Sequence, residues 1–574
     1  MSYQELDIRS TQLAHHLQEK GVNPGDLVGI CMDRGGEMII SLLAILKAGA
    51  VYVPIDPEYP QDRKQFMIQD AQMSHLLCSN PGFSRLFEEK GLQVIMVDLA
   101  DELFEKENKL PLAVKVTAQA PAYLMYTSGS LGQPKGVMIK HQSIARLLFN
   151  EEFSFLSPQT TLYQYAPLAF DASTFEIWGA LLKGGKLVIA NPGQKSLEDL
   201  RTDFENYQIN TVWLTAGLFH LAADTLPALF APIRYLLAGG DSIHLSSVER
   251  VMNQHKELTF INGYGPTEST TFAVIRQITD IDTIDKGLNI IGQPIGNTKA
   301  YVLAPESDQL LPVGCPGELC LSGPGLAEGY LNQPELSAQK FVANPYGEGA
   351  FAQLYRTGDL VRWLEDGSIE FLGRIDNQVK IRGYRIELGE IETILNDSAL
   401  VRQGLVLAKD STMGKRLVAY IIPEKGYEKE SLLTYLKSKL PEYMMPALFI
   451  EMNDFSLTGN GKLDRKALPE PDLSELVTTE YIAPRNEDET FLVETWKNLL
   501  NIEKIGIHDN FFELGGNSLL ATRLVAEIQD AFNLRIPLKV VFEFSTIAEM
   551  GQYIQLIKES SAEEDMHDEE VFEL

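Results

Sequence analysis

Residues 127 to 136 read Thr127-Ser128-Gly129-Ser130-Leu131-Gly132-Gln133-Pro134-Lys135-Gly136. Hydroxyl groups and backbone amides beside glycines can approach phosphate oxygens closely, and Lys135 adds a positive charge. The stretch is not a Walker P-loop, because Lys135 lacks the G-x-x-x-x-G-K-[ST] spacing. It therefore predicts a loop that wraps a polyphosphate, with a plain glycine-rich turn as the alternative.

The length and composition of the chain indicate a soluble protein of several domains. A chain of 574 residues is too long for one core, so about three or four domains are expected. The hydrophobic fraction is 45% and the charged fraction 22%, as in ordinary globular proteins. The net charge of −30 argues against nucleic acid or an anionic membrane as a partner.

Cysteine use and targeting signals predict a cytoplasmic location. Of the four cysteines, Cys315 and Cys320 are close together, but no second pair completes a zinc site. They are expected to be structural thiols in a reducing compartment. The sequence contains neither a signal peptide nor an apolar run of about 18 residues, so no membrane span is predicted.

Hydrophobic periodicity divides the chain into five regions. Residues 1–375 alternate helical patterns with short apolar strands, which predicts a large α/β core with mostly parallel sheets. Residues 376–468 read as a small α+β subdomain, and the Pro- and acid-rich residues 469–484 as a linker. Residues 485–556 predict a four-helix bundle, and the acidic residues 557–574 a disordered tail.

The expected secondary structure can be placed along the chain. Strands are predicted at Val28–Met32, Ala50–Ile55, His75–Cys78, Gln93–Val97, Lys186–Ala190, Thr211–Leu214, Gln378–Ile381, Gln403–Lys409 and Leu417–Pro423. Helices are predicted at Arg9–Lys20, Glu37–Leu46, Leu388–Leu395 and Lys429–Lys439.

Further motifs accompany the Thr127–Gly136 stretch in a fixed order and identify a family. They are Leu46–Asp56 before it, then Phe170–Ser173, Asn262–Glu268, Gly317–Leu319, Tyr355–Asp359, Gly373–Gly383, Leu440–Met444 and Asn460–Arg465. This series resembles the adenylation domain of nonribosomal peptide synthetases, in the adenylate-forming superfamily, over residues 1 to about 468. Residues 485–556 resemble the peptidyl carrier protein that follows such domains.

The resemblance implies ATP, Mg²⁺ and 4′-phosphopantetheine as cofactors, and it assigns the ATP site residue by residue. Tyr264 would stack on adenine beside Asn262, and Asp359 would accept both ribose hydroxyls. Glu268 would help to hold Mg²⁺, a cation that prefers oxygen ligands. The other residues assigned to ATP are Thr127, Ser128, Gly129, Ser130, Gly132, Lys135, Gly265, Thr267 and Arg374.

The resemblance also implies an amino-acid substrate. Asp171 would pair with its α-amino group, since a buried carboxylate without a partner is costly; a helix N-cap is the alternative role. The side-chain pocket would lack charge and favour L-valine or a similar branched aliphatic, with soft selectivity among Val, Ile and Leu. By position it would be lined by Ala172, Phe175, Trp213, Leu237, Gly239, Gly263, Thr271 and Phe272, and closed by Asp171 and Lys462.

Ser518 lies in Leu514-Gly515-Gly516-Asn517-Ser518-Leu519-Leu520, at the expected start of a helix. A serine there is often an N-cap, but the resemblance implies that a phosphopantetheinyl transferase modifies it. The pantetheine thiol would then receive the aminoacyl group from the adenylate.

Two half-reactions at one site imply a hinge motion. Lys462 would bridge the substrate carboxylate and the phosphate during adenylation. Rotation of the small subdomain at Asp376 would then withdraw Lys462 and bring the Gly383 loop to the thiol's path. Glycine suits that loop, because a passing pantetheine arm needs a residue without a side chain.

Other readings and partners remain. The alternatives are an acyl-CoA-synthetase-like ligase, a stand-alone amino-acid:carrier ligase, and an inactive adenylation domain that acts as a carrier scaffold. The scaffold is favoured only by Leu131, which stands where the family usually has threonine. Because Met1–Leu6 already matches the first motif, the chain is expected to be a fragment of a larger synthetase. Neighbouring condensation or other synthetase domains would be partners, and the need for an MbtH-like protein stays open.

Overall fold

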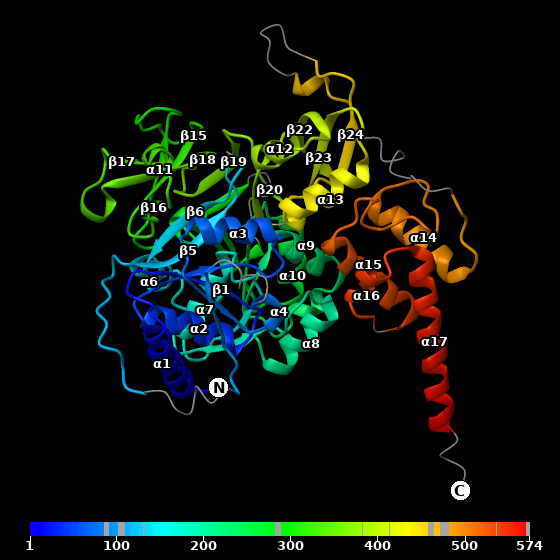
Figure 1. Cartoon of the computed structure of the whole chain (residues 1–574), viewed down its shortest axis with the longest axis horizontal. Helices are drawn as coiled ribbons and strands as arrows, with labels where there is room; N and C mark the ends of the chain where they lie inside the picture. Colours follow the sequence, from blue (N-terminus) through cyan, green and yellow to red (C-terminus); the bar gives the residue numbers. More distant parts are fainter. Residues whose placement is uncertain are drawn as a thin grey trace.

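The computed structural model describes residues 1–84, 91–100, 109–129, 132–281, 289–381, 383–411, 414–456, 464–470, 481–534 and 536–569. Two large sheets form the core of the first 375 residues (Figure 1). Along the seven-stranded sheet the strands are β16 (Gly329–Tyr330), β6 (Lys135–Lys140), β5 (Pro121–Thr127), β2 (Val51–Pro54), β1 (Leu27–Cys31), β3 (His75–Cys78) and β4 (Gln93–Met96).

The second sheet has twelve strands, which pair in parallel in one half of the sheet and antiparallel in the other. Its path runs through β14 (Lys299–Leu303), β15 (Gly317–Ser322), β18 (Gln353–Trp363), β19 (Ile369–Arg374), β13 (Ile290–Pro294), β12 (Val274–Ile278), β11 (Thr259–Tyr264), β10 (Tyr235–Gly239), β9 (Thr211–Thr215), β7 (Thr161–Gln164) and β8 (Lys186–Ile189), with β17 (Phe341–Ala343) paired to β18. Strands β11 to β8 pair in parallel, whereas β14 to β12 are antiparallel.

The prediction of mostly parallel sheets is therefore wrong for the antiparallel half of the larger sheet. Those strands follow one another without an intervening helix long enough for a parallel crossover, so they return in the opposite direction. The central parallel strands β2 and β3 are buried along their whole length, whereas β4 at the sheet edge is partly exposed. The predicted boundaries of β1, β2, β4, β8 and β9 agree within one residue at each end.

Helices cover the core sheets. They are α1 (Tyr3–Glu19), α2 (Gly36–Lys47), α3 (Gln61–Asp70), α4 (Pro81–Ser84), α6 (His141–Leu148), α7 (Ala172–Leu181), α8 (Leu197–Tyr207), α9 (Ala216–Thr225), α10 (Leu245–Gln254) and α11 (Pro334–Lys340). The N-terminus of α1 is stabilised by a capping box, in which the Ser2 hydroxyl accepts from the Glu5 amide and the Glu5 carboxylate accepts from Ser2. This box lets α1 begin six residues before its predicted start.

The small subdomain follows β19. Its elements are β20 (Gln378–Ile381), β21 (Tyr384–Glu387), α12 (Leu388–Asn396), β22 (Val401–Ser411), β23 (Gly414–Pro423), α13 (Lys429–Lys439) and β24 (Leu448–Glu451). β20 and β21 form a two-stranded antiparallel pair, and β22, β23 and β24 form a separate sheet. Leu432 and Leu436, one turn apart on α13, bury its apolar face in the subdomain core.

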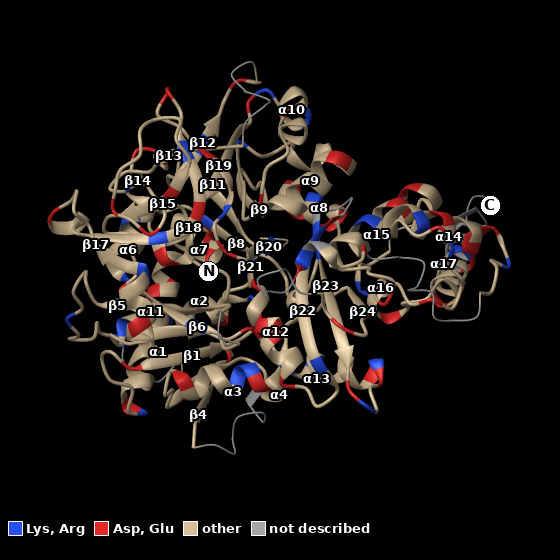
Figure 2. Ribbon diagram, turned by 90° about the horizontal axis from the view of Figure 1, so that it is seen from above, with Lys and Arg blue, Asp and Glu red and all other residues tan. Residues whose placement is uncertain are grey.

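The carrier region forms a helical unit of its own, with a core that includes Trp496 and Phe511. Its helices are α14 (Glu487–Leu500), α15 (Ser518–Phe532), α16 (Lys539–Glu543) and α17 (Ile547–Glu569). Figures 1 and 2 both place it at one side of the molecule, with α15 facing α8 and α9. Acidic and basic positions are interspersed along the ribbon in Figure 2.

The disordered tail predicted from residue 557 is wrong up to residue 569, because α17 continues through Glu569. Extending a helix that is already nucleated on a packed core requires no apolar face, since propagation adds one hydrogen bond per residue. Residues 570–574 lie outside the described residues. Within the described part of the chain, no helix is both long and apolar enough to cross a membrane.

Candidate active site

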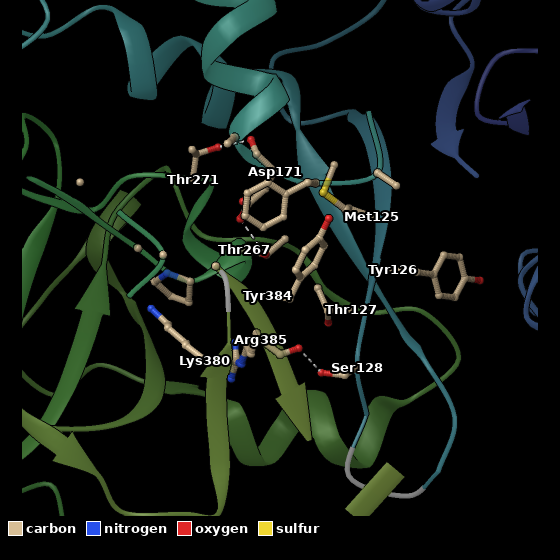
Figure 3. A pocket seen from close by; sticks show the side chains of 18 of the residues that line it. Met125, Tyr126, Thr127, Ser128, Asp171, Thr267, Thr271, Lys380, Tyr384 and Arg385 are labelled. Atoms are coloured by element: carbon tan, nitrogen blue, oxygen red, sulfur yellow. Dashed lines mark hydrogen bonds between the residues drawn. The ribbon is translucent and has the colours of Figure 1, made fainter. Parts of the chain in front are cut away.

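A cavity lies between the core and the small subdomain (Figure 3). The carboxyl ends of β5 and β11 and the start of α7 form its core wall, and the β20–β21 turn forms the opposite wall. Carboxyl ends of strands are the usual ligand-binding edge of α/β sheets. The predicted residues that line this cavity are Thr127, Ser128, Asp171, Ala172, Trp213, Gly263, Gly265, Thr267, Thr271, Phe272, Asp359, Arg374 and Gly383.

Asp171 faces this cavity and does not cap a helix. It occupies the N-cap position of α7, but its side chain makes no capping hydrogen bond. Instead its Oδ2 accepts a hydrogen bond from Thr267 Oγ1 at 2.6 Å. Burial raises the pKa of the Asp171 carboxyl, although the Thr267 hydroxyl opposes that change. The carboxylate is thus available to a cation that enters the cavity.

The segment after Thr267 holds a strained backbone. Thr270 and Thr271 have φ values of 56° and 60°, which β-branched residues rarely adopt. The buried Arg146 secures this turn, because its guanidinium donates to the carbonyls of Phe272, at 2.6 Å, and Ser269. Burial lowers the pKa of Arg146 to about 10. Sequence reasoning missed Arg146, since nothing in the α6 pattern marks it.

Asp359 and Arg374 form the polar end of the cavity. Asp359 Oδ1 accepts from Arg374 Nη1 at 2.7 Å, and Oδ2 accepts from the Tyr264 hydroxyl. Arg374 also donates to both carboxylate oxygens of Asp376, each at 2.6 Å. The predicted hinge residue Asp376 therefore connects by one arginine to Asp359. Asn262, also predicted nearby, is buried, and its side-chain nitrogen donates to the Ile290 carbonyl at 3.5 Å.

Glu268 is fully buried behind the cavity and surrounded by donors. Its Oε2 accepts from Arg385 at 2.9 Å, and its Oε1 lies 2.7 Å from the Tyr330 hydroxyl and 3.5 Å from Lys135 Nζ. Burial would raise the pKa of Glu268, but Arg385 and Lys135 outweigh it and hold the pKa well below the usual range. A buried carboxylate kept ionised by neighbouring cations fits a role as a Mg²⁺ ligand.

The predicted phosphate loop begins where β5 ends. Thr127 Oγ1 is buried and has no hydrogen-bond partner among the described residues, as expected of a group that awaits a ligand. The Ser128 hydroxyl donates to the Arg385 carbonyl at 2.7 Å, and the Gly129 amide donates to Glu390 Oε2 at 3.1 Å. Gly132 lies against α12, where an added Cβ would come within 2.6 Å of Thr393. Ser130, Leu131 and Lys462 lie outside the described residues.

The predicted side-chain pocket ends in a cluster of aromatic rings. Phe175 lies 5.3 Å from both Phe272 and Phe153, measured between ring centroids. Gly263 is needed beneath Phe272, because a Cβ there would approach that ring to 2.5 Å. The structure places three predicted residues behind the cavity surface rather than on it: Phe175, Leu237 and Gly239.

Lys380 and Arg385 reach the cavity from the subdomain, opposite Asp171 and Thr271 (Figure 3). Lys380 Nζ lies 5.2 Å from the centre of the Tyr264 ring, and burial lowers the pKa of this lysine, opposed chiefly by Asp359. Neither residue was predicted as a site residue. Their positions within Gln378-Val379-Lys380-Ile381-Arg382-Gly383-Tyr384-Arg385 could have suggested them, since Gly383 was already assigned there.

A second, larger cavity adjoins this site and is lined partly by the C-terminal helical unit. It shares Phe170, Trp213 and Tyr384 with the first cavity, and it ends beside Ser518. Close glycines line the approach: a Cβ on Gly240 would lie 2.9 Å from Gly383 Cα. Gly383 has φ +86° and contacts Thr215, so glycine is required by both its conformation and the available space.

Ser518 is the first residue of α15, but it is not the cap. Asn517 caps the helix, and its side chain accepts hydrogen bonds from the amides of Leu519 and Leu520. Leu519 packs on α9, where a Cβ on Gly217 would be 3.4 Å from it. The Ser518 hydroxyl is therefore not used for capping, and it lies at the mouth of the second cavity, which fits a phosphopantetheine attachment site.

Family models match three parts of the chain. The model described as AMP-binding enzyme matches residues 1–331, and its C-terminal domain model matches residues 390–462. The model described as phosphopantetheine attachment site matches residues 490–554. The chain belongs to the AMP-binding enzyme family, and it combines a nonribosomal peptide synthetase adenylation domain with a carrier domain.

Relatives agree with this assignment. Gramicidin S synthase 2 of Brevibacillus brevis is 42% identical over 96% of this chain, and bacitracin synthase 3 of Bacillus licheniformis is 40% identical over 98%. The chain spans only 12% and 9% of their respective lengths. The structure of holo-PA1221, a protein with adenylation and PCP domains, matches with a TM-score of 0.82 and 31% identity, over 96% of this chain and 91% of that one.

The class of the enzyme follows from these matches. The chain is an adenylating ligase of the nonribosomal peptide synthetase type, which uses ATP and Mg²⁺ and carries 4′-phosphopantetheine.

Proposed function

We propose that this chain activates L-valine, or a similar branched aliphatic amino acid, as an aminoacyl adenylate and loads it onto the carrier at Ser518. The observation that carries the proposal is a pair of adjoining cavities, one lined by Asp171 and the other by Ser518, which share Phe170, Trp213 and Tyr384. Asp171 supplies the anionic partner for an α-amino group. The acyl-CoA-synthetase-like alternative needs neither Asp171 nor a carrier serine.

Selectivity for a small branched side chain is supported by the aromatic cluster. Phe175 and Phe272 take up volume, and no charged side chain belongs to the predicted pocket apart from Asp171 and Lys462. One methylene changes binding by only roughly 1–3 kcal/mol, so isoleucine and leucine would be weaker substrates rather than excluded ones.

In adenylation, the residues of this chain orient the reactants. Asp171 would bind the ammonium group of the substrate. Asp359 would accept hydrogen bonds from the ribose hydroxyls through the lone pairs that Tyr264 and Arg374 leave unused. Thr127 and Ser128 would bind phosphate oxygens, and Glu268 would hold Mg²⁺, which supplies charge neutralisation on the polyphosphate. Lys462 would stabilise the charge that develops as the carboxylate attacks the α-phosphorus.

Thioester formation would use the arrangement in which Gly383 and Tyr384 of the small subdomain line the first cavity. Asp464 and Arg465, which follow Lys462, do not line it. The pantetheine thiol supplies the nucleophile when the arm is attached to Ser518. Gly240 and Gly383 line the first cavity and add no side chain to it, and a Cβ on Gly240 would lie 2.9 Å from Gly383 Cα.

The test is amino-acid-dependent ATP–pyrophosphate exchange with Val, Ile, Leu, Ala, Phe and 2-oxoisovalerate. Exchange that peaks on valine, with none for 2-oxoisovalerate, is the expected result. A peak on another amino acid would discard the pocket assignment but keep the enzyme. Loading of free CoA would instead favour the CoA ligase, and no exchange with any substrate would favour the scaffold. Partners such as a phosphopantetheinyl transferase and neighbouring synthetase domains form part of this proposal.

A further inference from the structure

A phenylalanine outside the predicted side-chain pocket lies directly behind it. Phe153 belongs to the loop between α6 and β7, and its side chain is fully buried. Its ring centroid is 5.3 Å from that of Phe175 and 6.1 Å from that of Phe272, and those two lie 5.3 Å from each other. Phe272 lines the first cavity, whereas Phe153 does not, so Phe153 belongs to the layer behind the pocket wall.

Hydrogen bonds that meet at Arg146 fix the backbone of Phe153 relative to that of Phe272. Arg146 Nη1 donates to the Phe272 carbonyl at 2.6 Å. The Arg146 carbonyl accepts from the side-chain nitrogen of Asn150 at 3.0 Å, and the side-chain oxygen of Asn150 accepts from the Phe153 amide at 3.0 Å. The loop that carries Phe153 therefore cannot move away from Phe272 without breaking hydrogen bonds of the buried Arg146, which would be costly.

The two rings in front of Phe153 are confined from other sides as well. A Cβ on Gly263 would approach the Phe272 ring to 2.5 Å, so the β11 backbone already touches this ring. Phe175 is fully buried and contacts both other rings. Because a protein interior is closely packed, the position of a ring depends on the volume of its neighbours. The volume of side chain 153 therefore determines how far Phe175 and Phe272 extend toward the substrate.

We infer that Phe153 determines specificity for the substrate side chain, as a positioning residue that does not itself touch the substrate. This inference rests on the proposed function. Phe153 holds Phe175 and Phe272 forward and so limits the depth of the pocket to that of a small branched aliphatic side chain. A smaller residue at position 153 lets the two rings tilt back, and the pocket then accepts a longer side chain.

The test is ATP–pyrophosphate exchange of Phe153→Leu and Phe153→Ala with valine, leucine and phenylalanine. The ratio of kcat/KM for leucine to that for valine is expected to rise by about tenfold or more, because room for one methylene is worth about 10–200-fold in selectivity. Phenylalanine should gain more in Phe153→Ala, which leaves the larger void. The KM for ATP should not change. A leucine-to-valine ratio that stays at the wild-type value in both variants would overturn the inference.

Two variants serve as matched controls. Phe155→Leu alters the same loop, but the ring partners of Phe155 among the described residues are Phe153 and Tyr235. Phe204→Leu removes an equally buried ring from a separate core cluster. Both should lose thermal stability, as Phe153→Leu does, and keep the wild-type leucine-to-valine ratio. An equal rise of the ratio in Phe204→Leu would show that any loss of core packing relaxes selectivity, and would also overturn the inference.

A further variant keeps the inference testable if the truncated proteins do not fold. Methionine fills irregular gaps in a core and is flexible, so Phe153→Met should fold and still let Phe175 move. Its leucine-to-valine ratio should exceed that of the wild type. If wild-type exchange requires an amino acid but no variant at position 153 changes the ratio, the inference fails while the proposed function stands. No exchange of the wild type with any amino acid would overturn the proposed function itself.

Discussion

The two walls of the first cavity are held by different kinds of contact. On the core wall, the Thr267 hydroxyl donates to the Asp171 carboxylate and the Thr271 hydroxyl to the Asp171 carbonyl, and all three residues belong to segments anchored in the same sheet. On the subdomain side, Arg385 of the wall and Glu390 behind it are held by ion pairs to residues distant in the chain. The first wall rests on contacts within the core, whereas the second rests on ion pairs that ligands could replace, as the proposed hinge motion of the subdomain requires.

The largest loss of activity is expected for a variant of the carrier domain, which lies outside both walls. Ser518→Ala should abolish covalent loading of the amino acid, because the attachment oxygen is lost, while ATP–pyrophosphate exchange stays at the wild-type rate. Intact-protein mass spectrometry after incubation with transferase, CoA, ATP and amino acid measures loading. Retained loading would remove Ser518 from the mechanism.

Lys462→Ala should separate the two half-reactions. Adenylation should fall below detection, a loss of at least about 10²–10³-fold, because the group that neutralises the developing charge is gone. Transfer from a supplied aminoacyl adenylate to the holo carrier should continue near the wild-type rate, measured in single turnover. An equal collapse of both reactions would contradict the two-arrangement mechanism.

A variant of the core wall should weaken adenylation. Asp171→Ala removes the anionic partner of the substrate ammonium group and should lower kcat/KM for the amino acid in exchange by about 10²–10³-fold, the cost of a broken buried ion pair. Initial-rate exchange assays check this result, with the KM for ATP as the internal control. A wild-type kcat/KM would show that the amino group binds elsewhere.

A variant of the subdomain wall should affect only transfer. Gly383→Ala adds a Cβ 3.0 Å from Thr215 at a positive φ, a conformation that costs alanine about 1–2 kcal/mol. Thioester formation should slow by about tenfold while exchange is unchanged. Gly426→Ala is a matched control, because Gly426 also has a positive φ but nothing lies within 4 Å of its Cβ position. Slowed exchange in Gly383→Ala alone would place this loop in adenylation instead.

The smallest effect concerns pH. Burial raises the pKa of Asp171, so in the free enzyme its carboxylate becomes protonated at a higher pH than an ordinary aspartate. Amino-acid affinity should therefore weaken as the pH falls through that raised pKa, while the substrate ammonium stays charged. The KM for the amino acid should rise on the acid side more than the KM for ATP. A KM for the amino acid that is independent of pH would contradict the assignment.

Helices and strands were predictable from the sequence where the pattern that produces them lies within one segment. His75–Cys78 and Lys429–Lys439 were predicted with the observed bounds, because a short apolar run and a helical period are visible within one segment. The antiparallel half of the larger sheet was not, since strand direction depends on pairing between distant segments. The helix beyond residue 557 was missed, because an acidic composition shows that a segment does not pack into a core but not whether a preceding helix continues into it.

The sequence by itself determined the chemical groups and their order: the hydroxyl- and glycine-rich loop, Asp171, Glu268, Asp359 and Ser518. It could do so because each reaction needs certain side chains next to certain backbone features. Only the tertiary structure decided that the side chains of Asp171 and Ser518 do not cap a helix and that they line two adjoining cavities. Likewise, only domain docking brings Arg385 to Glu268 and Glu390 to Gly129, because no local pattern encodes an ion pair between residues more than a hundred positions apart.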